Sequence, residues 1–358
     1  MNRRWARSVA ALSAALGLVC GAASPRPGVD FARLMSDAPE PTLQAYRLFE
    51  DARGSRPAPG VTPYTLNTPL FSDYAEKRRF LYLPPGTAMT YRDRGVMDIP
   101  VGGVLIKTFG YRPDQRDASA VARPVETRLL IHRNAGWAAL TYVWNAEGTE
   151  AVLKRAGTSL KVAFVGSDGA KREIDYVVPN VNQCKQCHSV NGQLSPIGPK
   201  ARNLNGPYDY GSGVENQLDH LSKAALLTQA PSSSSIARTP TWDSLSETVD
   251  ARARAYLDVN CGHCHSRSGF ASNSGLFLEL EETDASALGV GKRPVAAGRA
   301  SGGLEYAIAP GDPDHSIIIH RMASVEPGVM MPQLGRSVTH AEGLALVRAY
   351  IAQMKPAM

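Results

Sequence analysis

Two copies of one short motif, C-x-x-C-H, constrain this chain more than any other feature. They span Cys184–His188, with the order Cys-Lys-Gln-Cys-His, and Cys261–His265, with the order Cys-Gly-His-Cys-His. Two cysteines at this spacing can bond to the two vinyl-derived carbons on one porphyrin edge, and the adjacent histidine can turn its imidazole to the iron. The sequence therefore predicts two covalently bound haems c as cofactors.

This interpretation assigns roles to both halves of each motif. The thioether-forming cysteines and the proximal iron ligands are, in chain order, Cys184, Cys187, His188, Cys261, Cys264 and His265. Three other interpretations fit less well. Zinc sites built from two C-x-x-C pairs usually have spacers of about 15–20 residues, whereas 73 residues separate Cys187 from Cys261. A thioredoxin-like redox motif needs no histidine after both pairs. Two disulfides are chemically allowed in an exported protein.

The ligand on the opposite face of each iron bears on function, because an iron with two protein ligands is usually an electron carrier. For the second haem the sequence predicts Met331, which directly precedes Pro332, with Met330 as second choice. Between the motifs the sequence offers no methionine and a single histidine, His220, on an apolar helical stripe that also suits a packing or surface role. The alternatives for the first haem are an open site or a ligand from outside this stretch: Met89, Met97, His132 or Met322.

The N-terminal pattern predicts a secretory signal over residues 1–23, because three early arginines are followed by an apolar stretch and then by small residues. Without those arginines the net charge falls from +6 to +3, which is too small and too scattered for a nucleic-acid binder. The sequence predicts an exported, periplasmic protein. Cys20 follows Val19, where a lipoprotein signal wants a small residue, so a soluble product and a lipid anchor through Cys20 both stay open.

The remaining chain changes character along its length. Bounded β-prone runs at Val101–Phe109, Arg128–His132 and Trp137–Trp144, with turn residues between them, predict strands and hairpins. Apolar residues at helical spacing predict helices over Val214–Leu227, over Ser246–Asn260, and after a capping box of Thr339 with Glu342. The predicted organisation is a signal peptide 1–23, an irregular segment 24–60, a β-rich domain 61–179, a first haem segment 180–228, a linker 229–245 and a second haem domain 246–356. The predicted fold class is α+β and multidomain, with a β-rich N-terminal domain followed by mainly α-helical cytochrome c-like segments.

Several stretches carry a family resemblance. Residues 246–354 resemble a class I cytochrome c domain, through Cys261–His265 and the Met331-Pro332 loop. From about Tyr64 the chain resembles a family of exported bacterial dihaem c-type cytochromes with a β-rich N-terminal part. The matching stretches are Asn67–Tyr74, Val181–Cys184, Ile197–Lys200, Asn216–Leu218, Ala255–Cys261 and Met331–Gly335. The resemblance implies haem binding and electron transfer, and it carries no substrate.

Three functions follow as hypotheses. The first is a periplasmic electron carrier that exchanges electrons with other periplasmic or membrane redox proteins, its two haems differing in potential through their axial ligands. The second is a dihaem peroxidase-like oxidoreductase with an open or displaceable ligand site on the first haem. The third makes the β-rich domain a docking module for a redox partner. The sequence favours a carrier over an enzyme, because no acid–base pair can be assigned beside the first haem.

Overall fold

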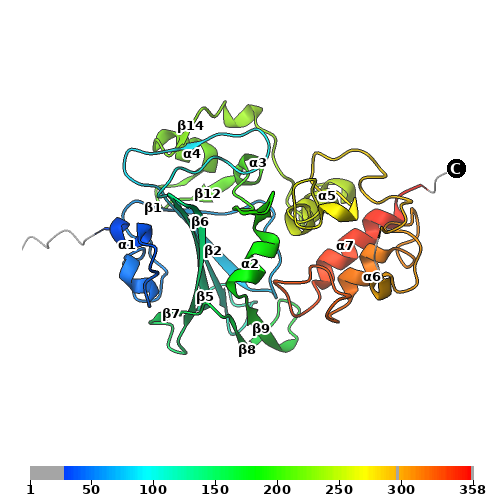
Figure 1. The fold of residues 1–358 in the computed structure, drawn as a ribbon, viewed down its shortest axis with the longest axis horizontal. Helices are drawn as coiled ribbons and strands as arrows, with labels where there is room; N and C mark the ends of the chain where they lie inside the picture. Colours follow the sequence, from blue (N-terminus) through cyan, green and yellow to red (C-terminus); the bar gives the residue numbers. More distant parts are fainter. Residues whose placement is uncertain (1–27, 296–297, 356–358) are drawn as a thin grey trace, which may run out of the picture.

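A computed structural model describes residues 28–295 and 298–355, and the predicted signal peptide with Cys20 lies outside this range. At its centre is a six-stranded antiparallel sheet of strand order β1-β2-β4-β5-β6-β7 (Figure 1). The strands are β1 Val61–Tyr64, β2 Glu76–Tyr82, β4 Val104–Tyr111, β5 Arg123–Arg133, β6 Gly136–Trp144 and β7 Ala151–Leu153. Each strand after β1 is hydrogen-bonded to the preceding one in this order, so the sheet is an antiparallel meander with β3 left out.

One face of the sheet is an apolar core. Successive side chains of a strand point to opposite faces, and in β5 the residues Leu129 and Ile131 are fully buried on this face. They pack with Leu34 of α1 (Phe31–Met35) and with Tyr46 of the 3-10 turn η1 (Leu43–Tyr46). The N-terminal segment, expected to be irregular, forms these two short helical elements and covers this face.

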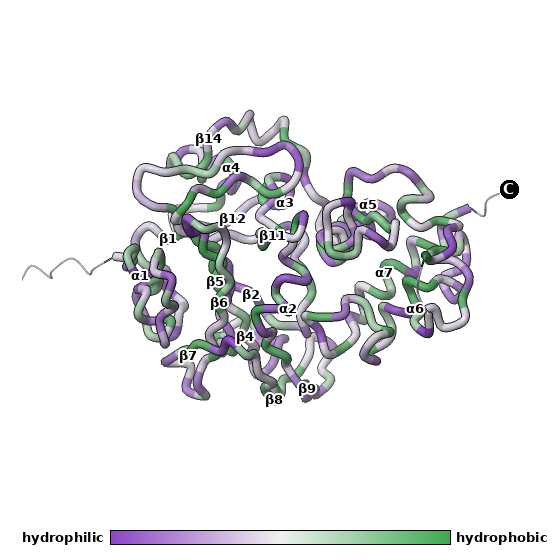
Figure 2. Tube along the Cα trace, viewed as in Figure 1, coloured by the Kyte–Doolittle hydropathy of each residue, from purple (hydrophilic) through white to green (hydrophobic). Residues whose placement is uncertain are grey.

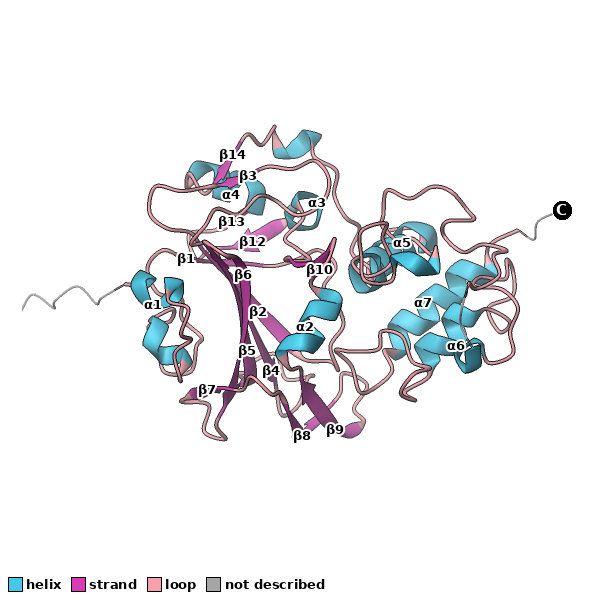
Figure 3. Ribbon diagram, viewed as in Figure 1, coloured by secondary structure: helices cyan, strands magenta, loops and turns pink. Residues whose placement is uncertain are grey.

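The opposite face of the sheet looks toward α2 (Val181–Cys187), which lies between the sheet and the C-terminal helices (Figure 3). Apolar residues of this face near the ends of β2 and β4, among them Leu81 and Leu105, pack with Leu204, Leu218 and Leu227. Figure 2 shows hydrophobic residues along the central strands and along the C-terminal helices. The α2 face also carries charged side chains, which are described below.

The hairpin expected between Arg128–His132 and Trp137–Trp144 is present, and the chain forms a second hairpin after it. The residues Arg133 and Gly136 pair across the turn that joins β5 to β6. The second hairpin joins β8 (Thr158–Val165) to β9 (Lys171–Val178). Apolar residues on one side of this pair, such as Val162 and Ile174, form a further core with Phe109 of the central sheet.

Between the sheet and the second motif the chain forms short elements. They are β10 Ser189–Val190, β11 Gln193–Leu194, α3 Ala201–Leu204, β12 Pro207–Asp209, β13 Val214–Asn216, α4 Gln217–Lys223 and β14 Leu227–Thr228. The strand β14 pairs in parallel with β3 (Met89–Thr90), which fastens this segment to the β-rich part. The predicted helix Val214–Leu227 is shorter than expected, because the Asn216 side chain accepts from the Leu218 amide and starts α4 there.

The expected fold class is wrong. The protein is β-rich, and a helical cytochrome domain is not observed in the described part of 246–356. The helices there are α5 (Val249–Leu257), α6 (Ile317–Ala323) and α7 (Ala341–Ala352), with a π-helical turn at Asp258–Gly262. Long loops containing only short 3-10 turns connect Gly262 to Ile317 within the described residues.

Glycine conformation explains part of this difference. Gly289 and Gly302 adopt positive φ, which a right-handed helix excludes. A Cβ at Gly289 would lie 2.6 Å from the Leu276 side chain, and one at Gly302 would lie 2.7 Å from His320. The loops therefore pack closely against their neighbours in conformations that only glycine accepts. The expected capping box is also absent, since Thr339 Oγ1 donates to the Ala323 carbonyl (3.2 Å) and leaves α7 without a side-chain cap.

Among the described residues, none of the helices has the length and apolar character needed to cross a membrane.

Candidate functional site

The two C-x-x-C-H motifs meet in space. The ligand atoms of Cys187, His263 and Cys264 all lie within 4.8 Å of one another. Cys264 Sγ also lies 3.6 Å from the Gln186 carbonyl oxygen of the first motif. A main-chain hydrogen bond of 3.0 Å from Asn191 to Ser268 joins the segments that follow the motifs. Two segments far apart in the sequence therefore form one site between the sheet and the C-terminal helices.

Local hydrogen bonds set the first motif at the end of α2. A capping box starts the helix, with Asn180 and Gln183 each accepting from the other's amide at 2.9 Å. The helix is seven residues long, so Cys184 and Cys187 share its last turns and His188 caps its end. A short helix that begins with a capping box thus carries both cysteines and ends at the predicted iron ligand, His188.

The imidazole of His188 is oriented for metal ligation. Its Nδ1 lies 3.2 Å from the Ser195 carbonyl oxygen. A carbonyl only accepts, so Nδ1 carries the proton and Nε2 keeps its lone pair. Burial, followed by the nearby Lys107 charge, lowers the pKa of His188 to about 3, which favours the neutral form that binds metals.

The second motif follows α5, whose first turn is capped by Thr248. The helix widens into the π-helical turn Asp258–Gly262, a feature that often marks functional sites. His265 Nδ1 lies 3.2 Å from Ser274 Oγ, which itself donates to the Ala271 carbonyl at 2.7 Å. Ser274 must then accept from Nδ1, so His265 also keeps the Nε2 lone pair. Burial lowers the pKa of His265 to about 4.

Two adjoining cavities contain the predicted ligands. The first cavity, of about 200 Å³, is lined by Cys184, Cys187 and His188 together with side chains of the sheet. The second cavity, of about 690 Å³, is lined by the second motif and by apolar side chains from the C-terminal part: Leu276, Leu278, Ile308, Ile317 and Ile318. Cys187, Cys261, His263, Met322 and Met331 line both cavities.

These features test whether the residues suit a haem. Cofactor cavities measure about 300–1,000 Å³ and are mostly apolar, and the second cavity meets both criteria. The first cavity is smaller than that range. Both motifs meet the donor criterion, since each offers two thiols and one histidine Nε2. The first motif therefore fits by its donors, and the second by donors and volume.

Met331 lies in the same cavity as His265, and Met330 lines neither cavity. The Met331 amide donates to the Arg321 carbonyl (2.9 Å), and its carbonyl accepts from Arg336 Nη2 (2.8 Å). The main-chain amide and carbonyl of Met331 are thus both hydrogen-bonded, which fixes the loop at this residue. Met331 and His265 therefore line one cavity, and the role of Met331 as an iron ligand stays a prediction.

The structure does not bring His220 to the first motif. Its Nδ1 bonds to Glu215 (2.6 Å), its ring stacks on Tyr210 with centroids 3.4 Å apart, and it lines neither cavity. The other candidates divide. Met89 and Met97 lie in an apolar core, and His132 bonds to the Ile99 carbonyl, whereas Met322 lines both cavities.

The four thiols differ in acidity. Burial raises the pKa of Cys261 to about 12 and that of Cys184 above its ordinary value. Contact with the Cys264 thiol, together with the nearby His263, lowers the pKa of Cys187, while the same contact raises that of Cys264.

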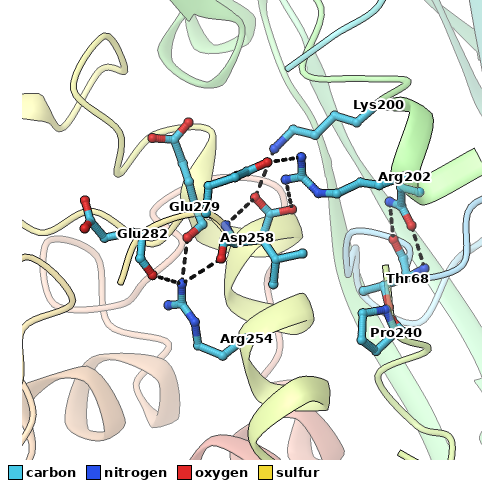
Figure 4. A network of polar contacts seen from close by, with 11 residues as sticks. Thr68, Lys200, Arg202, Pro240, Arg254, Asp258, Glu279 and Glu282 are labelled. Carbon is cyan, nitrogen blue, oxygen red and sulfur yellow. Dashed lines mark hydrogen bonds and ion pairs between the residues drawn. The ribbon is translucent and has the colours of Figure 1, made fainter. Parts of the chain in front are cut away.

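Buried ion pairs fix the two motifs relative to each other (Figure 4). Asp258, three residues before Cys261, accepts from Lys200 at 3.0 Å and from Arg202 at 2.9 Å. The Asp258 side chain is 1% exposed and that of Arg202 is 5% exposed. Arg202 also contacts Glu281. The segment after the first motif is thereby tied to the turn that carries the second.

Sequence reasoning missed several residues of this site. The ring of His263, inside the second motif, lies against Cys187 of the first motif, and among the described residues its buried Nδ1 has no hydrogen-bond partner. Arg79, Lys107 and Arg128 line the first cavity from three different strands. No local pattern marks these three, because only strand register brings them together.

A comparison of the chain with protein-family models, with curated proteins and with solved structures found no match.

Proposed function

We propose that this protein is a periplasmic electron carrier with two covalently attached haems c. The first haem is attached to Cys184 and Cys187 with His188 as proximal ligand, and the second to Cys261 and Cys264 with His265. The observation that carries the proposal is the contact between the two motifs at Cys187, His263 and Cys264. Two redox centres attached at such a distance suit electron exchange within one chain.

A haem bound at each motif would supply an iron that can accept and release one electron. The residues of the chain set the conditions around it. The carbonyl of Ser195 and the hydroxyl of Ser274 hold the two histidines with Nε2 free, as outer hydrogen bonds do at other metal sites. Met331, which lines the same cavity as His265, would supply a thioether to the second iron, and a thioether ligand would raise the potential of that haem.

The partners in this proposal are other periplasmic or membrane redox proteins, with the protein exported by its signal segment and either soluble or anchored through a lipid on Cys20. Nucleic acid is not among them, since the basic excess is small.

A second candidate is a dihaem peroxidase-like oxidoreductase. One observation favours it: His220, the one histidine between the two motifs, bonds to Glu215 and stacks on Tyr210 instead of lining either cavity. An iron at the first motif without a second protein ligand is open to small molecules. Spectroscopy of the oxidised protein with cyanide or peroxide separates the two candidates. Two low-spin haem signals that neither additive changes support the carrier. A high-spin haem signal that changes when cyanide or peroxide is added supports the enzyme.

The attachment itself is tested by substitution of single cysteines, after expression in a host that attaches c-type haem. The haemochrome spectrum and the intact mass should show two covalent haems in the wild type. Cys184→Ser and Cys187→Ser should each leave one of the two thioether bonds to the first haem, and Cys261→Ser should do the same for the second.

The matched pair Cys184 and Cys187 separates haem attachment from a metal ion held by Cys187, His263 and Cys264. Cys184 does not belong to that group. A bound zinc ion that survives Cys184→Ser and disappears in Cys187→Ser, with no covalent haem in the wild type, would refute the proposed function.

A further inference from the structure

Three basic side chains form a row across the middle of the sheet. Arg79 of β2 pairs directly with Lys107 of β4, and Lys107 pairs with Arg128 of β5. Residues directly opposite in adjacent antiparallel strands point to the same face. All three line the first cavity, which they share with His188. We call these three residues the basic row.

The basic row carries more positive charge than its protein partners neutralise. Arg128 makes a two-pronged ion pair with Glu126, at 2.5 and 2.8 Å. That carboxylate is fully buried and also accepts from Tyr176. Arg79 is 7% exposed, and its hydrogen bond goes to the Lys77 carbonyl at 3.3 Å.

Lys107 is the central member of the row. Among the described residues its ammonium group has no hydrogen bond and no ion pair, and it lies 5.1 Å from the centre of the Phe109 ring. Burial, followed by the charges of Arg128 and Arg79, lowers its pKa to about 7.

Such a row opposes folding when nothing is bound. Like charges directly opposite each other across strands are destabilising, and a buried charge without a partner has lost its hydration. An apolar row would stabilise the fold more at this position. The neighbouring row is apolar and consists of Leu81, Leu105 and Leu130. Three cations that face one cavity, with one carboxylate among them, form a site that attracts an anion.

We propose that the basic row binds the carboxylates of the first haem, its two propionates. This inference rests on the proposed function, since it requires a haem at Cys184 and Cys187. The propionates are the charged groups on the haem periphery, and arginine forks bind carboxylates in two-pronged geometry. The first motif closes the cavity from α2 and the basic row lines it from the sheet, so a haem held by the first motif meets the row.

The test uses the protein with both haems attached. Arg79→Gln and Lys107→Gln each remove one charge from the row, and Lys161→Gln is the matched control, since Lys161 is exposed on β8 and pairs with Asp175. The reduction potential of each haem is measured by spectroelectrochemistry. A Cys261→Ser, Cys264→Ser double variant, which carries the first haem alone, assigns the signals.

A cation beside a haem favours the less positive ferrous state. Each row variant should therefore lower the potential of the first haem, by a tenfold or larger change in its ferrous-to-ferric ratio, equivalent to about 59 mV. The second haem and the Lys161→Gln protein should keep their potentials. The propionate bending band in the resonance Raman spectrum should shift in the row variants alone, which a charge effect without contact would not produce.

Three results would overturn the inference. One is a protein with both haems in which the row variants match Lys161→Gln in potential and Raman band. Another is saturable binding of acetate or inorganic phosphate to the two-haem protein that Arg79→Gln abolishes, which would assign the row to a free anion. The third is a haemochrome assay without covalent haem, which refutes the proposed function itself. If Arg79→Gln fails to fold, Arg79→Lys replaces it in the test. This variant keeps the charge but loses the two-pronged guanidinium, so it should shift the Raman band with little change in the potential of the first haem.

Discussion

Asp258 is the residue through which the two motif-bearing segments are tied together, and its replacement tests that interpretation. Its carboxylate is almost fully buried and neutralises both Lys200 and Arg202. In Asp258→Asn the shape is kept and the charge is lost, so the buried Arg202 and the partly buried Lys200 lose their shared partner. Arg202 retains Glu281, whereas Lys200 loses its ion pair.

The expected loss follows from the burial of the pair. Removing one partner of a buried ion pair costs about 3–5 kcal/mol, and the lower end applies here because Arg202 keeps a second carboxylate. With a urea slope of about 3 kcal/mol/M, a loss of about 3 kcal/mol lowers the urea midpoint by about 1 M. The assay is urea unfolding followed by circular dichroism.

The control is Asp175→Asn, which removes the acidic partner of an ion pair with Lys161 in which both side chains are more than half exposed. Screening by solvent makes such pairs weak, so the control should unfold at the wild-type midpoint. Equal midpoints for Asp258→Asn and Asp175→Asn would refute the idea that the buried pair holds the segments together.

Three further predictions concern acid, the core and the sulfur ligand. Burial raises the pKa of Asp258, but the charges of Lys200 and Arg202 have the larger effect and lower it. The stabilisation by Asp258 is therefore complete above the ordinary aspartate pKa of about 3.9 and is lost as the pH falls through the lower pKa of the folded state. The urea midpoints of the wild type and of Asp258→Asn should converge in that acid range. Leu129→Ala, at a fully buried position, should lower the free energy of unfolding by about 2–5 kcal/mol in the same assay, and a loss well under 1 kcal/mol would contradict the core described here. Met331→Ala should abolish the optical band of a methionine–iron bond in the oxidised protein while Met330→Ala keeps it, and the reverse pattern would assign the ligand to Met330.

Much of the β-rich part could be predicted from the sequence. The strands β4, β5 and β6 follow from bounded runs of β-branched and aromatic residues, and the Arg133–Gly136 turn follows from local turn chemistry. The C-terminal part was harder. The Thr339 and Glu342 pattern indicated a capping box, but the Thr339 hydroxyl donates to the Ala323 carbonyl, sixteen residues away. Tertiary contacts overrode a local preference.

The first cavity shows the same limit for function. His220 was the natural candidate by sequence position, yet the chain directs it to Glu215 and Tyr210 instead. The residues that do face His188 from the sheet, such as Lys107, have no motif of their own. Their relation depends on the register between β2, β4 and β5, and a shift by one residue would turn them to the other face.

The sequence by itself determined which atoms are available for the proposed haem attachment, because two thiols and an imidazole at C-x-x-C-H spacing depend only on neighbours along the chain. It also indicated Met331 as a candidate iron ligand, by its position before a proline. Only the tertiary structure decided that the two motifs touch, that Met331 shares a cavity with His265, and that a basic row faces the first motif. These relations join segments far apart in the sequence, and they arise from strand register and from buried pairs such as Lys200 with Asp258, which no local pattern encodes.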